Sequence, residues 1–207
     1  MKKFILTDET IEMFGVTLHR IKAVRSFGNV KEGDLGGFVE KEENISENFK
    51  AWVYCNAKVW GNAEVLGNAK VLGNAKVWGN AKVLGNAEVW DNAKVLGNAE
   101  VWDNAEVFGN AKVLGNAEVL GNAKVLGNAE VWDNADYIVF KNWWSSGRYF
   151  TWTRSNNMWS VGCFYGTGEE LIKKAYADSE KSGREYERVV KFVQSILEDD
   201  NNQEKSL

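Results

Sequence analysis

Few residues of this sequence are suited to acid–base or metal chemistry. The chain of 207 residues has one histidine, His19, and two cysteines, Cys55 and Cys163, which are far apart. A catalytic acid or base needs a pKa near the working pH, and a zinc site needs several ligands. Because no second histidine can join His19, we expect it to be an ordinary strand residue. The sequence therefore predicts a protein that is not an enzyme and that uses no cofactor and no metal.

A second set of residues is suited to binding. From residue 143 to residue 159, tryptophan, tyrosine and arginine are interspersed with asparagine. Aromatic and guanidinium groups can stack on a nucleobase or anchor a protein interface. Rings on a hairpin can instead pack as a small core, which we expect for most of them. The residues predicted to bind are Arg148, Tyr149, Trp152, Arg154, Asn156 and Asn157, with the two arginines beside hairpin loops as the main contacts.

The elements that position these residues are dominated by a repeat. From Cys55 to Asn134 the chain reads Gly-Asn-Ala-Lys/Glu-Val-Leu/Trp almost without a break. A short fixed period is typical of a parallel β-helix, in which each coil stacks on its neighbour. Alanine and valine are predicted to face inward, because a column of buried lysines would hold unpaired charge. Glycine and asparagine tolerate positive φ angles and are predicted to form the corners, where stacked asparagines can bond to one another.

The repeat also predicts which side chains stack. If three repeats make one coil, residues 18 apart lie above one another, and the array makes roughly four to five coils. This register predicts a column of lysines at Lys58, Lys76, Lys94 and Lys112 and two further columns of charged residues. Such columns are commonly just solvated, but they can also orient a partner by charge complementarity.

The large apolar residue before each corner is predicted to point outward. In the 18-residue register these residues form ridges, and exposed apolar area of this size usually marks an interface. Partial burial of each ring against the next coil is the alternative. We predict a homo-oligomer, either a dimer or a trimer, that buries one ridge. The residues assigned to this interface are Trp60, Trp78, Leu96, Leu114, Trp132, Trp90 and Phe108.

The ends of the chain are not repetitive and suggest three domains. Residues 1–42 are expected to form an N-terminal β cap, because the first coil of a solenoid is an open edge. Residues 43–138 are expected to form the hexapeptide-repeat β-helix, and residues 139–207 a β-hairpin with two helices.

Strand and helix signals define the C-terminal module. Residues 137–140, 149–153 and 159–164 read as antiparallel strands. Thr167–Glu170 and Ser182–Glu185 each read as a capping box that opens a helix. The fold class predicted for the whole chain is therefore mainly β, with a small helical part at its end.

Composition sets the expected compartment and partners. The net charge of −4 argues against an ordinary nucleic-acid-binding protein. Asp8 and Glu9 interrupt the apolar run that a signal peptide would need, and no segment approaches the length of a membrane span. The cysteine content suggests a reducing compartment. We therefore expect a cytoplasmic protein, in the host cytoplasm if a phage encodes it, without a membrane partner.

Several segments carry a resemblance to a known family. They are Ile21–Phe27, Val30–Phe38, Trp52–Tyr54, the Gly-Asn-Ala array, Trp152–Asn157 and Val161–Thr167. On these segments, and over nearly its full length, the chain resembles the bacterial and phage hexapeptide-repeat proteins that are often labelled transferases. The resemblance implies a left-handed parallel β-helix with a short C-terminal hairpin-helix module, and often a phage or prophage origin.

The functional prediction combines these observations. We expect a non-enzymatic binding protein that inhibits or sequesters a host factor, such as a host defence enzyme or a signalling nucleotide. Its partners would be further copies of the chain and a host protein or small nucleotide. An acyltransferase-like enzyme with an unexpected base and a structural scaffold are the alternatives.

Overall fold

The computed structural model describes residues 2–204, with the side chains of residues 2–199. The chain forms two compact units. Unit 1 comprises Met1–Val139 and Thr153–Asn156, and unit 2 comprises Phe140–Trp152 and Asn157–Leu207. The boundary between the units runs through two strands, so each unit is described separately below.

Unit 1 begins with a β cap that is continuous with the solenoid. Strands β1 (Phe4–Met13) and β2 (Val16–Ala23) form an antiparallel hairpin. Its turn residues Phe14 and Gly15 have φ angles of 52° and 80°, as a tight hairpin turn requires. Strand β3 (Leu35–Val39) pairs antiparallel with β2 and parallel with the first coil. The short 3-10 helix η1 (Glu42–Asn44) follows.

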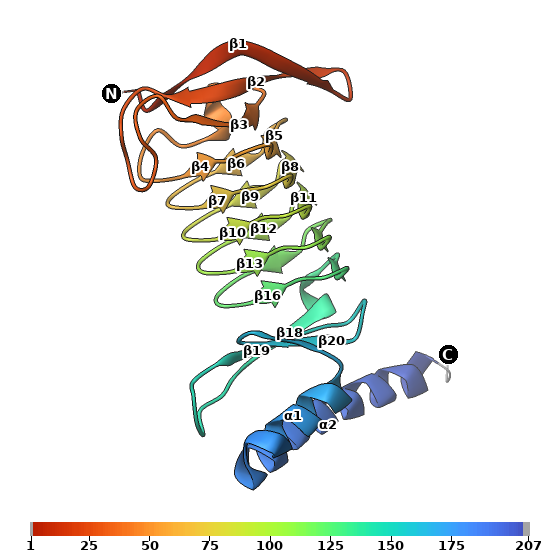
Figure 1. The fold of residues 1–207 in the computed structure, drawn as a ribbon. Helices are drawn as coiled ribbons and strands as arrows, with labels where there is room; N and C mark the ends of the chain where they lie inside the picture. The colour runs from red at the N-terminus through yellow and green to blue at the C-terminus, as the bar shows by residue number, and fades with distance from the viewer. Residues whose placement is uncertain (1, 205–207) are drawn as a thin grey trace. The chain divides into compact units, whose positions relative to one another are not determined.

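The repeats form a parallel β-solenoid of about five coils with three strand columns. The column that continues the cap contains β5 (Lys58–Val59), β8 (Lys76–Gly79), β11 (Lys94–Gly97), β14 (Lys112–Val113) and β17 (Glu130–Val131). The second contains β4 (Trp52–Val53), β7 (Lys70–Val71), β10 (Glu88–Val89), β13 (Glu106–Val107) and β16 (Lys124–Val125), which Figure 1 shows one above another. The third contains β6 (Glu64–Val65), β9 (Lys82–Val83), β12 (Glu100–Val101) and β15 (Glu118–Val119).

The predicted inward positions and the register of the coils are confirmed. Every repeat alanine from Ala57 to Ala129 and every repeat valine from Val59 to Val131 is at most 1% exposed. Strands pair in register at a spacing of 18 residues, as Val95 does with Val77 and Val113. Backbone amides of each coil donate hydrogen bonds to carbonyls of the next coil, so the stacked side chains stand on a rigid backbone. The left hand of the coil stays an expectation that the family resemblance implies.

The corners carry ladders of asparagine side chains. The Nδ2 of Asn62 donates to the Oδ1 of Asn80 at 3.1 Å, and Asn80 donates in the same way to Asn98 at 2.9 Å. The preceding corner residue has a positive φ angle, even at Asp91 (58°), where aspartate replaces glycine. Residues with a Cβ are strained in this conformation, so the preference for glycine follows from the backbone.

The last coil of the solenoid is capped by side chains of unit 1. The Ser155 hydroxyl accepts a hydrogen bond from the Glu130 amide at 2.7 Å, and the Asn134 side chain accepts one from the Glu118 amide at 2.8 Å. Asn134 belongs to the short 3-10 helix η2 (Asn134–Asp136). These bonds satisfy amides that would otherwise form an open edge.

The C-terminal part of the chain contains a four-stranded sheet and helices. The strands, in spatial order, are β18 (Tyr137–Lys141), β19 (Tyr149–Thr153), β20 (Met158–Val161) and β21 (Phe164–Gly166). The strand expected over residues 159–164 is divided by a turn at Gly162, whose φ angle is 60°. The helices are α1 (Gly168–Asp178) and α2 (Glu180–Glu204). None of the helices within residues 2–204 is both long and apolar enough to span a membrane.

One of the two predicted capping boxes is correct. At Thr167 the hydroxyl accepts a bond from the Glu170 amide, and the Glu170 carboxylate accepts one from the Thr167 amide at 2.8 Å. The box predicted at Ser182 is wrong, because α2 begins at Glu180 and Ser182 lies inside it. Ser179 supplies the cap instead, since its hydroxyl accepts a bond from the Ser182 amide at 3.1 Å.

Candidate functional site

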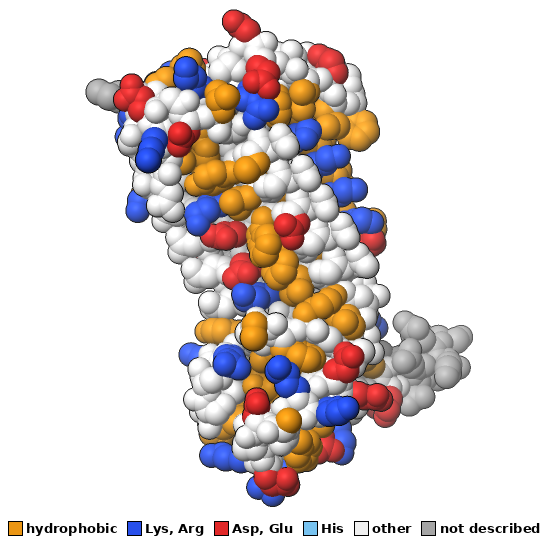
Figure 2. Space-filling model, in the orientation of Figure 1, with side chains coloured by type: hydrophobic (Ala, Val, Ile, Leu, Met, Phe, Trp, Pro, Cys, Tyr) orange, Lys and Arg blue, Asp and Glu red, His pale blue; other side chains and the backbone are white. Residues whose placement is uncertain are grey.

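The lysine column on β5, β8, β11 and β14 lies on the outward face of the solenoid. Lys58 is opposite Lys76, Lys76 is opposite Lys94, and Lys94 is opposite Lys112 in the strand register. Neighbouring strands in a sheet are about 4.8 Å apart, so the column holds like charges at short, regular spacing. Figure 2 shows blue side chains one above another at the margin of the solenoid where Figure 1 places β5, β8 and β11.

The charges of this column are poorly neutralised. In the described part of the chain neither Lys76 nor Lys94 forms an ion pair, whereas Lys112 pairs with Glu130 at 2.5 Å. Lysines of the other two columns each contact a glutamate one coil away, as Lys70 does with Glu88 at 2.6 Å. The further pairs of this kind are Lys82–Glu100 and Lys124–Glu106. The column therefore gives this face a run of positive charge that the other faces lack.

The pKa of Lys58 is lowered by its surroundings. Burial lowers the pKa of Lys58, and the positive charges of Lys76 and Arg20 lower it further. The Arg20 guanidinium lies 4.2 Å from the centre of the Phe38 ring, and Phe38 pairs with Lys58 in the register. Arg20 itself pairs with Glu9 of the cap at 2.8 Å, so the cap balances this charge, and the unpaired charge of the column lies on the solenoid.

A ridge of apolar residues runs beside the lysine column. Lysine and the ridge residue are two positions apart on each strand, so both point to the same face. Trp60 and Trp78 stack with their ring centres 4.9 Å apart. The cap covers the first of these rings, because Trp60 packs with Leu18 and Phe38 and is 6% exposed. Trp132, at the other end of the ridge, is 58% exposed.

The other residues assigned to the predicted interface are buried or half-buried. Leu114 is buried, whereas Leu96 and Trp78 are half-buried. Trp90 and Phe108, in another column, stack on each other with ring centres 4.3 Å apart. Stacking of rings one coil apart, considered above as the alternative to an interface, therefore occurs. The role of the ridges in self-association stays a prediction.

The predicted C-terminal binding residues are distributed over the two units. Arg148, Tyr149, Trp152 and Asn157 belong to unit 2, whereas Arg154 and Asn156 belong to unit 1. Trp152 is 2% exposed, and its indole N–H donates to the Asn157 side chain at 2.9 Å. The Asn156 side chain accepts a bond from the Thr153 hydroxyl at 2.6 Å. Trp152, Asn156 and Asn157 thus make local structural bonds, whereas Arg148 and Arg154 are exposed.

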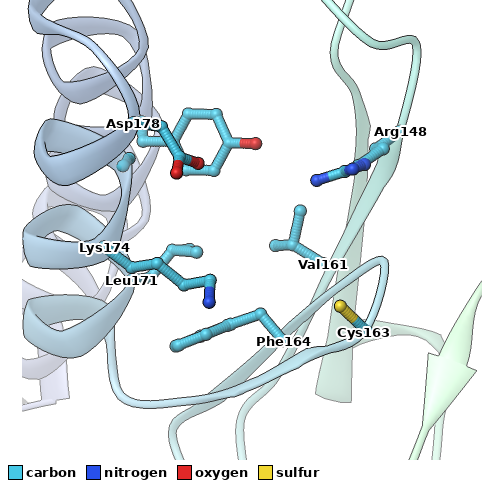
Figure 3. Close-up of a pocket in the computed structure, with 9 residues that line it drawn as sticks. Arg148, Val161, Cys163, Phe164, Leu171, Lys174 and Asp178 are labelled. Atoms are coloured by element: carbon cyan, nitrogen blue, oxygen red, sulfur yellow. The ribbon is translucent and has the colours of Figure 1, made fainter.

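Unit 2 contains a pocket that includes residues not predicted from the sequence. Arg148 lines it together with Lys174 and Asp178 of α1 and Tyr186 of α2. Figure 3 shows Arg148 opposite the two charged residues of α1. Lys174 and Asp178 flank the buried Leu171 and Ala175 on one helix face, which is a signal that could have identified them.

The lone histidine lies in the cap. His19 is on β2, and its Nδ1 lies 3.2 Å from the Thr7 carbonyl oxygen of the neighbouring strand β1. Among the described residues, no group of three or more histidine, cysteine, aspartate or glutamate side chains is arranged to hold a metal ion. Cys55 and Cys163 are both exposed, free thiols.

The fold places the chain among the parallel β-solenoid proteins. Comparison with protein-family models gives no match to the chain, and comparison with curated proteins gives no relative.

Proposed function

We propose that this chain is a non-enzymatic binding protein that docks an acidic partner protein on the lysine-bearing face of its solenoid. The single observation that carries the proposal is the column Lys58, Lys76, Lys94 and Lys112, in which Lys76 and Lys94 have no ion pair within the described residues. The proposal places the protein among inhibitors or sequestering proteins of a host factor, as its resemblance to phage hexapeptide-repeat proteins suggests, acting in the cytoplasm.

Rigidity supports this proposal. The lysines stand on strands whose amides bond to the next coil, for example Lys76 to the Ala93 carbonyl at 2.9 Å. A partner with carboxylates at a matching spacing would meet lysines whose backbone positions are already fixed, so no backbone entropy is lost on binding. Charge complementarity of this kind speeds association and fixes orientation, and it weakens as salt screens it.

The apolar ridge beside the lysines supplies the second half of the surface. Trp78 and Leu96 are half-buried and lie on the same face as Lys76 and Lys94. An interface commonly combines aromatic anchors at its centre with charged groups around them. The face therefore offers both an anchor and an orienting charge to an acidic protein.

The test is a pair of double variants with the same change in charge. Lys76→Gln with Lys94→Gln removes two charges from the exposed column, and Lys82→Gln with Lys124→Gln removes two from paired lysines on other faces. Binding to poly-L-glutamate is measured by calorimetry at low and moderate salt, and partners captured from a host lysate are compared by mass spectrometry. We expect the first double variant to lose affinity for poly-L-glutamate and to lose its captured partner, and the second to keep both. Equal loss in both variants would show that net charge, and not this face, controls binding.

A further inference from the structure

The pocket in unit 2 is formed by the helices and the hairpin of β20 and β21. Its apolar wall consists of Val161, Phe164, Leu171, Ala175 and Tyr186. The space between the lining side chains is about 310 Å³, its mouth included. The enclosed part of this space is only about 30 Å³, so an organic ligand would lie mainly in the open mouth. Small-molecule sites commonly combine a mainly apolar wall with a few polar groups, and the pocket has this combination.

Three charged side chains line the same space. Arg148, Lys174 and Asp178 are exposed at the pocket, and none of them forms an ion pair or a side-chain hydrogen bond within the described part of the chain. In Figure 3 the Arg148 side chain extends from the sheet side, and Lys174 and Asp178 lie on the helix side. Two cations and one carboxylate therefore face an apolar wall and remain available to a ligand.

The helix geometry explains why the charges reach the apolar wall. Leu171, Lys174, Ala175 and Asp178 are spaced so that they share one face of α1. Leu171 and Ala175 are 1% and 2% exposed, so this face is directed toward the interior of unit 2. Lys174 and Asp178 consequently lie at the edge of the buried face and not on the opposite, solvated side of the helix.

Arg148 is held in position by its loop and by a neighbouring turn. Its carbonyl accepts a bond from the Asn142 amide at 2.7 Å, and the buried Asn142 side chain accepts bonds from the amides of Trp144 and Ser145. The Arg148 side chain crosses the turn at Gly162, where a Cβ would lie 3.3 Å from the Arg148 Cδ. Glycine at this turn thus leaves the room that the arginine side chain occupies.

We propose that this pocket binds a small organic anion that also carries a hydrogen-bond donor. The anionic group contacts Arg148 and Lys174, because a guanidinium offers paired donors to a carboxylate or phosphate. The donor contacts Asp178, which accepts hydrogen bonds when ionised. The apolar body packs against Phe164 and Tyr186. This site is independent of the lysine column and lies wholly within unit 2.

The test uses three aminophenyl probes, two with an anionic group and one without it. The full-length protein, labelled with 15N, is titrated with 4-aminobenzoate, 4-aminophenyl phosphate and aniline, and binding is followed by amide chemical shifts. We expect saturable shifts around residues 161–164 and 171–178 with at least one of the two anions, and none with aniline at the same concentration. The anion that binds more tightly identifies the class of natural ligand as a carboxylate or a phosphate. Shifts elsewhere in the chain, or no shifts with either anion, would overturn the proposal.

Variants test the assigned contacts. Arg148→Gln should weaken the anion at least tenfold, whereas Arg184→Gln should change nothing, because Arg184 is exposed and contacts Glu180 on the same helix. Asp178→Asn should lower the affinity for 4-aminobenzoate more than the affinity for benzoate, which lacks the donor. A thermal melt of each variant checks its fold. Unchanged affinity in a folded Arg148→Gln protein would show that the pocket is not the site.

Discussion

Trp60 and Trp78 stack one coil apart with their planes only 2° from parallel, yet the first ring is 6% exposed and the second is half-buried. The difference arises because the β1–β2 hairpin and β3 cover Trp60 through residues such as Leu18 and Phe38. One ridge therefore contributes to the core at its capped end and offers an apolar surface farther along.

This division predicts that the same substitution costs much more stability at the capped end of the ridge than at its other end. Trp60→Glu should lower the stability by about 3 kcal/mol, because it places a carboxylate in a buried cluster. Trp132→Glu, at a residue that is 58% exposed, should change the stability by less than about 0.5 kcal/mol. If the chain self-associates through this ridge, Trp132→Glu should also reduce the mass measured by light scattering at tens of micromolar. A wild-type mass of 23.3 kDa would contradict the proposed self-association.

The inward valine column should dominate the stability of the solenoid. Val95 is fully buried between Val77 and Val113, so Val95→Asp should cost about 4 kcal/mol or more by burying an unpaired charge. Lys94→Asp, one residue earlier on the outward face, should cost less than about 0.5 kcal/mol. Thermal melts of the two variants make the comparison, and a larger loss in Lys94→Asp would reverse the assignment of inside and outside.

The corner glycines should differ in their tolerance of alanine. Gly79 has a φ angle of 78°, and an added Cβ would lie 2.9 Å from the Gly97 carbonyl oxygen. Gly121 has a φ angle of 70°, but nothing lies within 4 Å of an added Cβ. Gly121→Ala should therefore cost about 1–2 kcal/mol of backbone strain, and Gly79→Ala should cost clearly more. Urea unfolding of both variants tests this order, which equal costs would contradict.

Stability should rise with pH above pH 8 because of Lys3. Burial lowers the pKa of Lys3 to about 8 from its usual 10.5, with Glu47 opposing the shift and Arg25 adding to it. Between these values the unfolded chain retains a proton that the folded chain has released, so raising the pH favours the folded state. The gain should approach about 2 kcal/mol between pH 8 and pH 10, at no more than about 1.4 kcal/mol per pH unit.

The control for this prediction is Lys3→Met. The Lys3 ammonium donates to the carbonyls of Ser46 and Ala51, the latter at 2.9 Å, so the variant loses these bonds as well as the charge. Its stability at pH 8 is therefore not the readout. The readout is the change in urea midpoint from pH 8 to pH 10, which should be more positive for the wild type than for Lys3→Met. Parallel pH profiles would assign the shift to other groups.

The solenoid was predictable because every coil repeats the same pattern of inward apolar and outward charged residues. The alternation of Ala and Val with charged residues determines the inward face, and the period of three repeats determines which lysines stack. Thr167 was identifiable as a cap for a similar reason, since both partners of its reciprocal bonds are close in sequence.

The errors and omissions occur where local patterns compete or where distant segments meet. Ser179 and Ser182 are both good caps, and the backbone at Ser179, with a φ angle of −172°, breaks the helix first. The covering of Trp60 by the cap joins segments far apart in the chain. The meeting of Arg148 with Lys174 and Asp178 likewise depends on how α1 packs on the hairpin, which no short motif encodes.

The register of 18 residues makes the length of the cationic face a quantity that recombination can change. Removal of residues 80–97 would join Gly79 to Asn98 and preserve the repeat phrase across the junction. The shortened protein would lose Lys94 from the column and about 4.8 Å of its height, together with the Lys70–Glu88 and Lys82–Glu100 ion pairs. The inward alanines and valines would still lie above one another at the junction, because the period of 18 residues is kept. Duplication of the same segment would add one lysine and one step. A change in repeat number would thus alter the length of the cationic face and its number of lysines while the inward core of each coil is retained.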